Sequence, residues 1–281
     1  MLNNCGKCGA VVALHLRDCP VCNTPAGFPN VRVADSTKEV EALAVRYHSA
    51  MASAKARGLV LEVLAFENVV ATNSEAVMNR SLGALSTWLN GQSEFFYSFW
   101  HQVKYLGRQL TETEWDQQRG AAEAAINPYY YDSLNFAALT LDGQGMMYYG
   151  PYSVILKSVH IEDRASVFEK NPFSFCKTHH VVAGQAPPVG YRASWKDRAR
   201  LAVAKLQSEI SPGRPFAEIV MEARRGEPDC DFVEVHVFGP IHRLAIERIV
   251  GPEPKKRADR TTWRQVVRKA KELGAEVEVT T

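Results

Sequence analysis

Two Cys-x-x-Cys pairs near the start of the chain constrain its fold more than any other feature of the sequence. Cys5 and Cys8 form the first pair, Cys19 and Cys22 form the second, and ten residues separate the pairs. Each pair can turn two thiolates towards one ion, and two pairs complete a tetrahedral four-sulfur shell for Zn²⁺. Such a shell has no open position, so the zinc would be structural. We therefore predict a zinc ribbon over residues 1–30.

The composition limits what the rest of the chain can be. With 281 residues, 46% of them hydrophobic, the chain can bury a core as one large domain or two ordinary ones. The net charge of +2 means that any nucleic-acid binding must come from local patches. No apolar run approaches a membrane span, no signal-peptide pattern opens the chain, and the cysteine usage is typical of a reducing compartment. We expect a cytoplasmic protein.

Residues 31–125 are predicted to form a helical region. Ser36 and Glu39 have the spacing of a capping box, in which each side chain satisfies a backbone N–H at the helix start. Aromatic residues crowd the segment 93–106; they could stack nucleobases, although burial against neighbouring helices is the simpler explanation. Helices are expected over 36–57, 59–71 and 75–90.

Residues 126–281 change in character to short strands with few helices between them. Strands are expected over 136–141, 152–156, 161–168, 216–221, 231–238 and 276–279, and helices over 195–210 and 261–273. Because few crossover helices separate the strands, we predict a mixed or antiparallel sheet rather than a doubly wound parallel one. The predicted fold class is α+β, with a small zinc ribbon, a helical layer and a β-rich domain.

The stretch 231–241 carries the strongest functional signal outside the cysteines. Alternation along a strand places Phe232, Glu234, His236 and Phe238 on one face and three valines on the other. Burying an ionised carboxylate is costly, so a carboxylate and an imidazole on an otherwise apolar strand favour a functional site. An edge strand with both side chains in water is the alternative.

Short motifs over residues 130–250 form an ordered series. They are Leu141-Asp-Gly-Gln-Gly145 with Tyr148-Tyr-Gly150, then Arg164-Ala-Ser166 with Asn171, then Glu234-Val-His236 followed by Gly239-Pro-Ile241. This series resembles the fold of bacterial toxin-type ADP-ribosyltransferases. In that fold an early strand and loop grip NAD, a middle segment carries a serine near aromatics, and a late strand offers the catalytic glutamate.

The resemblance implies a role for each residue in cleaving the nicotinamide–ribose bond, which builds positive charge on the ribose. Glu234 would stabilise that charge and orient the 2′-hydroxyl, and His236 would position the acceptor or act as a base. In the cofactor-binding set the tyrosines would sandwich the nicotinamide, the arginine would pair with the pyrophosphate and the serine would orient the ribose. That set is Tyr148, Tyr149, Arg164, Ser166 and Asn171.

One departure from the family pattern leaves the acceptor open. Many arginine-modifying members have an acidic residue or Gln two positions before the catalytic glutamate, where this chain has Phe232. On the predicted C-terminal helix, Arg264, Arg268 and Lys271 are spaced to share one face. Together with a zinc ribbon they make nucleic acid, RNA before DNA, a credible acceptor beside protein, although a solvated helix face is the simpler explanation.

The leading hypothesis is therefore an NAD-dependent mono-ADP-ribosyltransferase, acting as an intracellular toxin or phage-defence effector. As a member of that class it would be accompanied by a neutralising antitoxin protein. The alternative is a non-catalytic zinc-ribbon protein that binds nucleic acid and uses residues 130–250 as a scaffold. A nuclease using Glu234, His236 and His242 is a third possibility, but it lacks a recognisable metal cluster.

Overall fold

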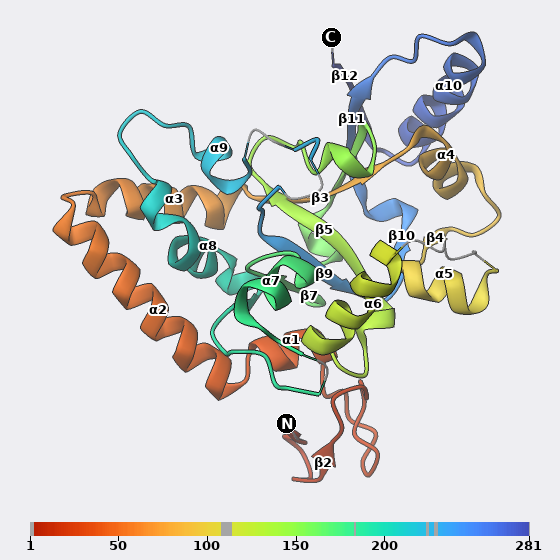
Figure 1. Cartoon of the computed structure of the whole chain (residues 1–281). Coiled ribbons are helices and arrows are strands. Elements are labelled where there is room, and N and C mark those ends of the chain that lie inside the picture. The colour runs from red at the N-terminus through yellow and green to blue at the C-terminus, as the bar shows by residue number, and fades with distance from the viewer. Residues whose placement is uncertain (1–2, 108–113, 183, 223–224, 228–229, 281) are drawn as a thin grey trace.

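The computed structural model describes residues 3–107, 114–182, 184–222, 225–227 and 230–280 (Figure 1). The helices are α1 (Pro29–Ala34), α2 (Thr37–Ala56), α3 (Val60–Asn73), α4 (Leu82–Asn90), α5 (Phe99–Tyr105), α6 (Glu114–Ile126), α7 (Pro172–His179), α8 (Arg198–Leu206), α9 (Phe216–Val220) and α10 (Arg257–Glu272). The strands are β1 (Asn3–Asn4), β2 (Val11–Val12), β3 (Glu75–Arg80), β4 (Phe95–Phe96), β5 (Leu134–Thr140), β6 (Tyr152–Leu156), β7 (Ala165–Phe168), β8 (Arg192–Ser194), β9 (Glu234–Phe238), β10 (Ile241–His242), β11 (Ile246–Pro252) and β12 (Glu276–Thr280). No described helix has the length and apolarity to cross a membrane.

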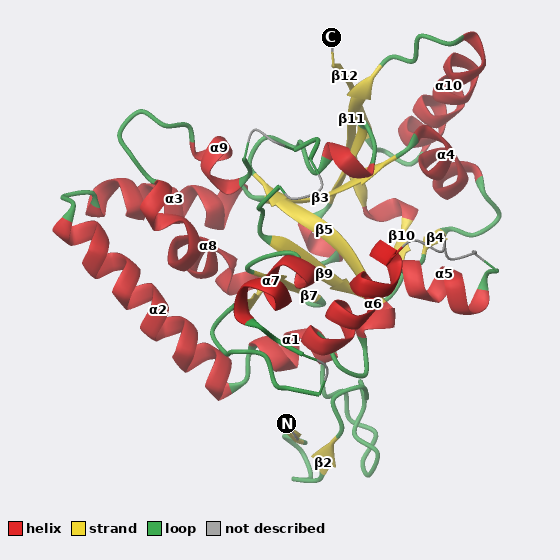
Figure 2. Cartoon of the chain, in the orientation of Figure 1, coloured by secondary structure: helices red, strands yellow, loops and turns green. Residues whose placement is uncertain are grey.

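An eight-stranded sheet organises the chain, with strand order β12-β11-β6-β3-β5-β9-β7-β8. Neighbouring strands are antiparallel except for β11 and β12, which are parallel. Helices surround this sheet, as Figure 2 shows. The predicted α+β class with a mixed, mainly antiparallel sheet is confirmed.

The sheet forks between β3 and β5. These two strands pair over three residue pairs only, from Glu75 opposite Thr140 to Val77 opposite Ala138. Beyond Val77, β3 continues along β6 as far as Arg80. Strand β5 instead runs along β9 through the five pairs from Leu134 to Ala138. The two halves of the sheet therefore separate, and they leave space between their edges.

The alternation predicted for β9 is what the structure shows. Val233, Val235 and Val237 are fully buried in the main core, which α2, α3 and α8 close on that side. Glu234 and His236 point to the opposite face of the sheet, where Asn127 after α6 contacts His236 and Asn171 before α7 contacts Glu234. The buried valines fix the strand's register, because a slip by one residue would exchange the two faces.

One expected helix, over 75–90, is wrong in its first half. Residues 75–80 form β3, a central strand, and a helix begins only after Ser81, whose Oγ accepts from the N–H of Ala84 at 3.3 Å. Residues 76–79 are buried on both faces of the sheet, so they show no strand-like alternation in the sequence. The region 31–125 thus contributes a strand to the middle of the sheet as well as helices.

Two further local expectations are corrected. Residues 216–221, expected to be a strand, form helix α9 up to Val220. Ser36 precedes α2 but makes no side-chain cap, and Glu39 is directed elsewhere. The Glu39 carboxylate accepts from the N–H of Gly190 at 2.6 Å and pairs with Arg192 at 3.2 Å. A buried tertiary ion pair has replaced the local capping box.

Helix α1 joins the cysteine-rich segment to the sheet. Arg32 donates from Nη2 to three carbonyl oxygens of the segment, those of Ala13, Leu14 and Leu16. Two residues earlier, buried Asn30 donates from Nδ2 to the carbonyl of Arg164, the hydroxyl of Ser166 and the carbonyl of His236. The first thirty residues are therefore tied directly to strands β7 and β9.

Candidate active site

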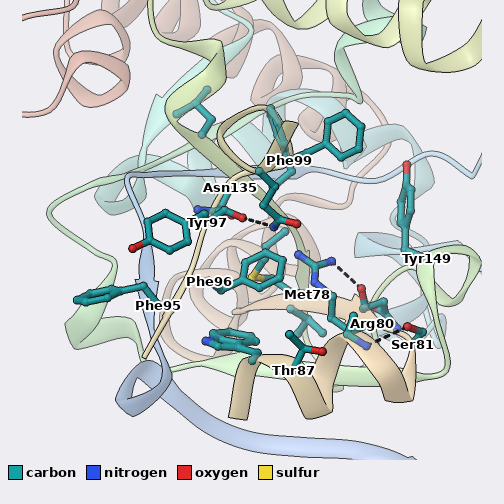
Figure 3. A pocket seen from close by; sticks show the side chains of 18 of the residues that line it. Met78, Arg80, Ser81, Thr87, Phe95, Phe96, Tyr97, Phe99, Asn135 and Tyr149 are labelled. Atoms are coloured by element: carbon teal, nitrogen blue, oxygen red, sulfur yellow. Dashed lines mark hydrogen bonds between the residues drawn. The ribbon is translucent and has the colours of Figure 1, made fainter. Parts of the chain in front are cut away.

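A cavity of about 820 Å³ lies at the fork between β3 and β5. Its walls come from β3, α4, the segment 91–106, β5 and the start of β9. Figure 3 shows Arg80 and Met78 from β3, Asn135 from β5, and the aromatic residues that face them. A cavity of this size lies within the range that holds small ligands and cofactors.

Glu234 lines this cavity as the first residue of β9, and it is only 4% exposed. In the sheet it lies between Ala138 of β5 and Phe168 of β7. Burial raises the pKa of the Glu234 carboxyl to about 8, although Arg119 and Asn171 favour the ionised form. The predicted catalytic carboxylate is therefore a desolvated group at the wall of a large cavity.

Two side chains contact the two oxygens of the Glu234 carboxylate, one each. The Nε2 of His236 lies 3.0 Å from Oε2, and the Nδ2 of Asn171 lies 3.5 Å from Oε1. Asn171 also caps α7, because its Oδ1 accepts from the N–H of Phe173 at 3.0 Å. His236 is fully buried and does not line the cavity, so it contacts the carboxylate from the side away from the cavity.

A cation that the sequence did not single out also lines the cavity. Arg119 of α6 pairs with buried Glu123 one turn later, and the other oxygen of Glu123 accepts from Trp100 Nε1 at 2.6 Å. Although burial opposes the charge, the attraction of Glu123 and Glu234 raises the pKa of Arg119. A permanent positive charge therefore faces the same space as the Glu234 carboxylate.

Aromatic side chains form much of the remaining wall. Phe96, Tyr97, Phe99 and Tyr149 line the cavity, and the guanidinium of Arg80 lies 4.5 Å from the centre of the Phe96 ring (Figure 3). Helix α5 contains no fully buried residue. The expectation that the 93–106 aromatics fill a core therefore holds only in part, because Phe96 packs against the main core while the segment also borders the cavity.

The predicted strand-and-loop motif 141–150 packs against β3. Asn79 donates from Nδ2 to the carbonyl of Gly150 at 3.0 Å and to Ser153 Oγ at 3.1 Å. A Cβ at Gly145 would lie 2.2 Å from Asn79 Oδ1, so only glycine lets the loop approach this closely. The motif thereby carries Met146 and Tyr149 to the cavity.

Three members of the predicted cofactor-binding set lie away from the cavity. Tyr148 is 54% exposed and is not a lining residue. Arg164 donates to the carbonyls of Phe238 and Pro240, at 2.8 Å each, and to that of His160 at 3.0 Å. Ser166 accepts from Asn30 and lies opposite His236 in the sheet. The contacts of Arg164 and Ser166 connect the chain around β7 to the chain around β9 and are structural.

The four N-terminal cysteines converge as predicted. Their sulfur atoms all lie within 4.8 Å of one another. The closest pairs are formed between the motifs, with Cys5 to Cys22 at 3.6 Å and Cys8 to Cys19 at 3.5 Å. A tetrahedral zinc site with Zn–S bonds of about 2.3 Å places its sulfurs about 3.8 Å apart. The spacing and the donor set therefore fit one zinc ion.

Comparisons with known proteins give a structural similarity only. No family model matches the chain, and no curated protein matches it. The chain is similar to Thermus sp. 2.9 DarT in complex with carba-NAD+, with a TM-score of 0.39 and 10% identity over 74% of this chain and 96% of that one. It is also similar to Thermus sp. 2.9 DarT in complex with ADP-ribosylated ssDNA, with a TM-score of 0.40 and 8% identity over 74% of this chain and 94% of that one.

One of these structures holds carba-NAD+ and the other holds ADP-ribosylated ssDNA. Similarity at this level carries no conclusion about activity. Any activity of this chain has to be inferred from the cavity and the residues that line it.

Proposed function

We propose that the chain is an NAD-dependent mono-ADP-ribosyltransferase whose cavity at the β3–β5 fork binds NAD. The observation that carries the proposal is the buried carboxylate of Glu234 at the wall of a cavity of about 820 Å³. Burying a carboxylate is costly, and one buried at the wall of a large cavity is a candidate functional group. A carboxylate is suited to stabilising the cationic ribose that forms when the nicotinamide–ribose bond breaks.

The chemistry follows from the charge that develops. The bond between the nicotinamide nitrogen and ribose C1′ breaks, the electron pair leaves with the neutral nicotinamide, and positive charge spreads over C1′ and the ring oxygen. An ionised Glu234 would stabilise that charge inside a poorly solvated site, where electrostatic effects are strong. A nucleophilic atom of the acceptor then forms the new bond to C1′ and loses its proton to the solvent.

The two lining arginines are the groups we assign to the NAD phosphates, in place of Arg164. Arg80 and Arg119 both border the cavity, from β3 and α6. A guanidinium matches phosphate oxygens bidentately, and neither arginine loses its charge at working pH. The aromatic side chains beside them, Tyr149 and Phe96, offer flat faces for the nicotinamide or adenine rings.

The acceptor that we propose is a nucleic acid. Helix α10 buries Trp263, Val266 and Ala270 against the protein, and together with the two residues that precede it the helix exposes a row of basic residues. These exposed residues are Lys255, Lys256, Arg257, Arg260, Arg264, Arg268 and Lys271. Since the whole chain carries only +2, this concentration of charge is local and complements a phosphate backbone. RNA and single-stranded DNA are the two acceptors to compare.

We also assign a structural Zn²⁺ to Cys5, Cys8, Cys19 and Cys22. The ion would stabilise the fold of the first thirty residues, which carry little core of their own. A role as an intracellular toxin or phage-defence effector with a neutralising antitoxin follows from the enzyme class, and it remains a prediction.

The test uses NAD labelled in its adenylate part. The labelled NAD and the purified zinc-loaded protein are incubated in separate reactions with cellular RNA, with single-stranded DNA and with cellular protein. Glu41→Gln is a matched control for Glu234→Gln, because Glu41 is exposed on α2. We expect label in a nucleic-acid fraction with the wild type and Glu41→Gln, but not with Glu234→Gln. No label in any fraction, with zinc bound and the fold intact, would favour the non-catalytic nucleic-acid-binding alternative.

A further inference from the structure

We propose that His236 is a positioning residue that holds Glu234 Oε2 through its Nε2–H and so fixes the orientation of the carboxylate at the cavity wall. The hydrogen bond and the tautomer rest on geometry alone, while their catalytic consequence rests on the proposed function. This differs from the role expected from the sequence, in which His236 would itself meet the acceptor or act as a base.

The contact between the two side chains is short and shielded from water. The Nε2 and Oε2 atoms lie 3.0 Å apart, and the two side chains are 2% and 5% exposed. A hydrogen bond to a charged group at such a site is among the stronger ones in proteins. His236 is therefore placed to fix one orientation of the carboxylate, but it cannot contact a molecule in the cavity.

The tautomer of His236 is set by the amide of Asn127. Arg192 Nη1 lies 3.5 Å from Asn127 Oδ1, and because a guanidinium only donates, the amide oxygen must be the atom that faces it. The amide nitrogen then faces His236 Nδ1, also at 3.5 Å. An amide nitrogen only donates, so Nδ1 must be the unprotonated, accepting nitrogen. In a neutral imidazole the proton is consequently on Nε2, which faces Glu234.

The orientation of Asn127 is in turn anchored by a buried network. Tyr130 donates from its hydroxyl to Asn127 Oδ1 at 3.4 Å. Arg192 donates to the carbonyl of Ile126 at 3.0 Å and pairs with Glu39 at 3.2 Å. A continuous hydrogen-bond network therefore connects the Arg192–Glu39 ion pair, through the amide of Asn127 and the imidazole of the next residue in the network, to the carboxylate at the cavity.

The surroundings also keep the imidazole neutral and in place. Phe136 packs edge-on against the ring at 5.0 Å between ring centres, and Phe168 covers it at 5.7 Å. Burial lowers the pKa of His236, and the charge of Arg192 lowers it further, while Glu123 acts in the opposite direction. A neutral donor suits the role, since an imidazolium would compete with the cationic ribose for Glu234.

Three substitutions separate positioning from packing. Gln places an amide nitrogen near the position of Nε2, whereas Asn reaches only as far as Nδ1, and Phe fills the apolar pocket without a donor. We expect His236→Phe and His236→Asn to lower kcat by about 10- to 100-fold, as loss of an orienting partner does. KM for NAD should change less than twofold, and His236→Gln should recover most of kcat.

The tautomer itself can be read by ¹⁵N NMR of the histidine side chain in the zinc-loaded protein. We expect a neutral ring protonated on Nε2 throughout pH 6–9. Protonation on Nδ1, or an imidazolium in that range, would overturn the proposal, as would equal kcat for the Gln and Asn variants. If Glu234→Gln retains transfer, the proposed function fails; if it is inactive while His236→Asn matches the wild type, only the positioning role fails.

Discussion

Glu234→Gln should make the protein more stable at alkaline pH. Burial raises the pKa of this carboxyl from 4.5 to about 8. Because the folded-state pKa lies above the unfolded one, ionisation favours the unfolded chain. The free energy of unfolding is therefore unaffected by Glu234 below about pH 4.5 and falls as the pH rises towards 8.

The magnitude follows from about 1.4 kcal/mol for each pH unit between the two pKa values. At pH 7 the ionisable carboxyl costs the wild type about 3 kcal/mol, and above pH 8 the cost approaches about 5 kcal/mol, an upper bound. Glutamine has the same shape and does not ionise, so it avoids this cost. The residue that we assign to catalysis is therefore expected to destabilise the fold that carries it.

The assay is urea unfolding of the zinc-loaded wild type, Glu234→Gln and Glu41→Gln at pH 5.5, 7 and 9. We expect the stability difference between Glu234→Gln and the wild type to grow with pH by about 3–4 kcal/mol in favour of the variant. Glu41→Gln should follow the wild type, and the His236 contribution cancels because burial keeps the folded imidazole neutral from pH 5.5 to 9 in all three proteins. A difference that stays constant from pH 5.5 to 9 would refute the claim that Glu234 is desolvated.

Three other predictions concern pH, metal and salt. NAD turnover by the wild type should rise with pH through about 8, because Glu234 ionises there. Steady-state rates between pH 6 and 9.5 measure this rise, and a rate that falls over that range would exclude the ionised carboxylate as the acting form. Cys19→Ser, or removal of zinc by a chelator, should lower the melting temperature, with zinc content falling in parallel; an unchanged melting temperature in zinc-free protein would exclude a structural ion. Replacing Arg264, Arg268 and Lys271 by Ala should reduce the slope of log affinity against log salt for nucleic acid by about 2–3; an unchanged slope would remove α10 from the interface.

The parts of the fold that could be predicted are those with a local cause. The spacing of the two Cys-x-x-Cys pairs predicted that their sulfur atoms converge. The alternating valines at 233, 235 and 237 indicate which face is buried, so the position of Glu234 on the opposite face followed from alternation. Helices α2 and α10 likewise begin and end within a few residues of their predicted bounds. Each of these features depends on residues that are neighbours in the sequence.

What could not be predicted depends on residues that meet only in the folded chain. Arg119 lies on α6, which was not among the predicted helices, and it becomes a site residue only because the sheet forks beside it. Strand β3 gave no alternation because both of its faces are buried. His236 was placed on the correct face, but the covering Asn127, distant in sequence, decides that it contacts Glu234 rather than the cavity.

The most direct test of the central claim is nicotinamide release from NAD, measured in the presence of pooled cellular RNA and denatured DNA. It needs no knowledge of the modified atom, and it compares the wild type, Glu41→Gln and Glu234→Gln at equal zinc content. We expect release by the first two and a loss of at least about 100-fold in Glu234→Gln, while that variant remains folded. Equal release by all three proteins would contradict the assignment of Glu234 as the catalytic residue.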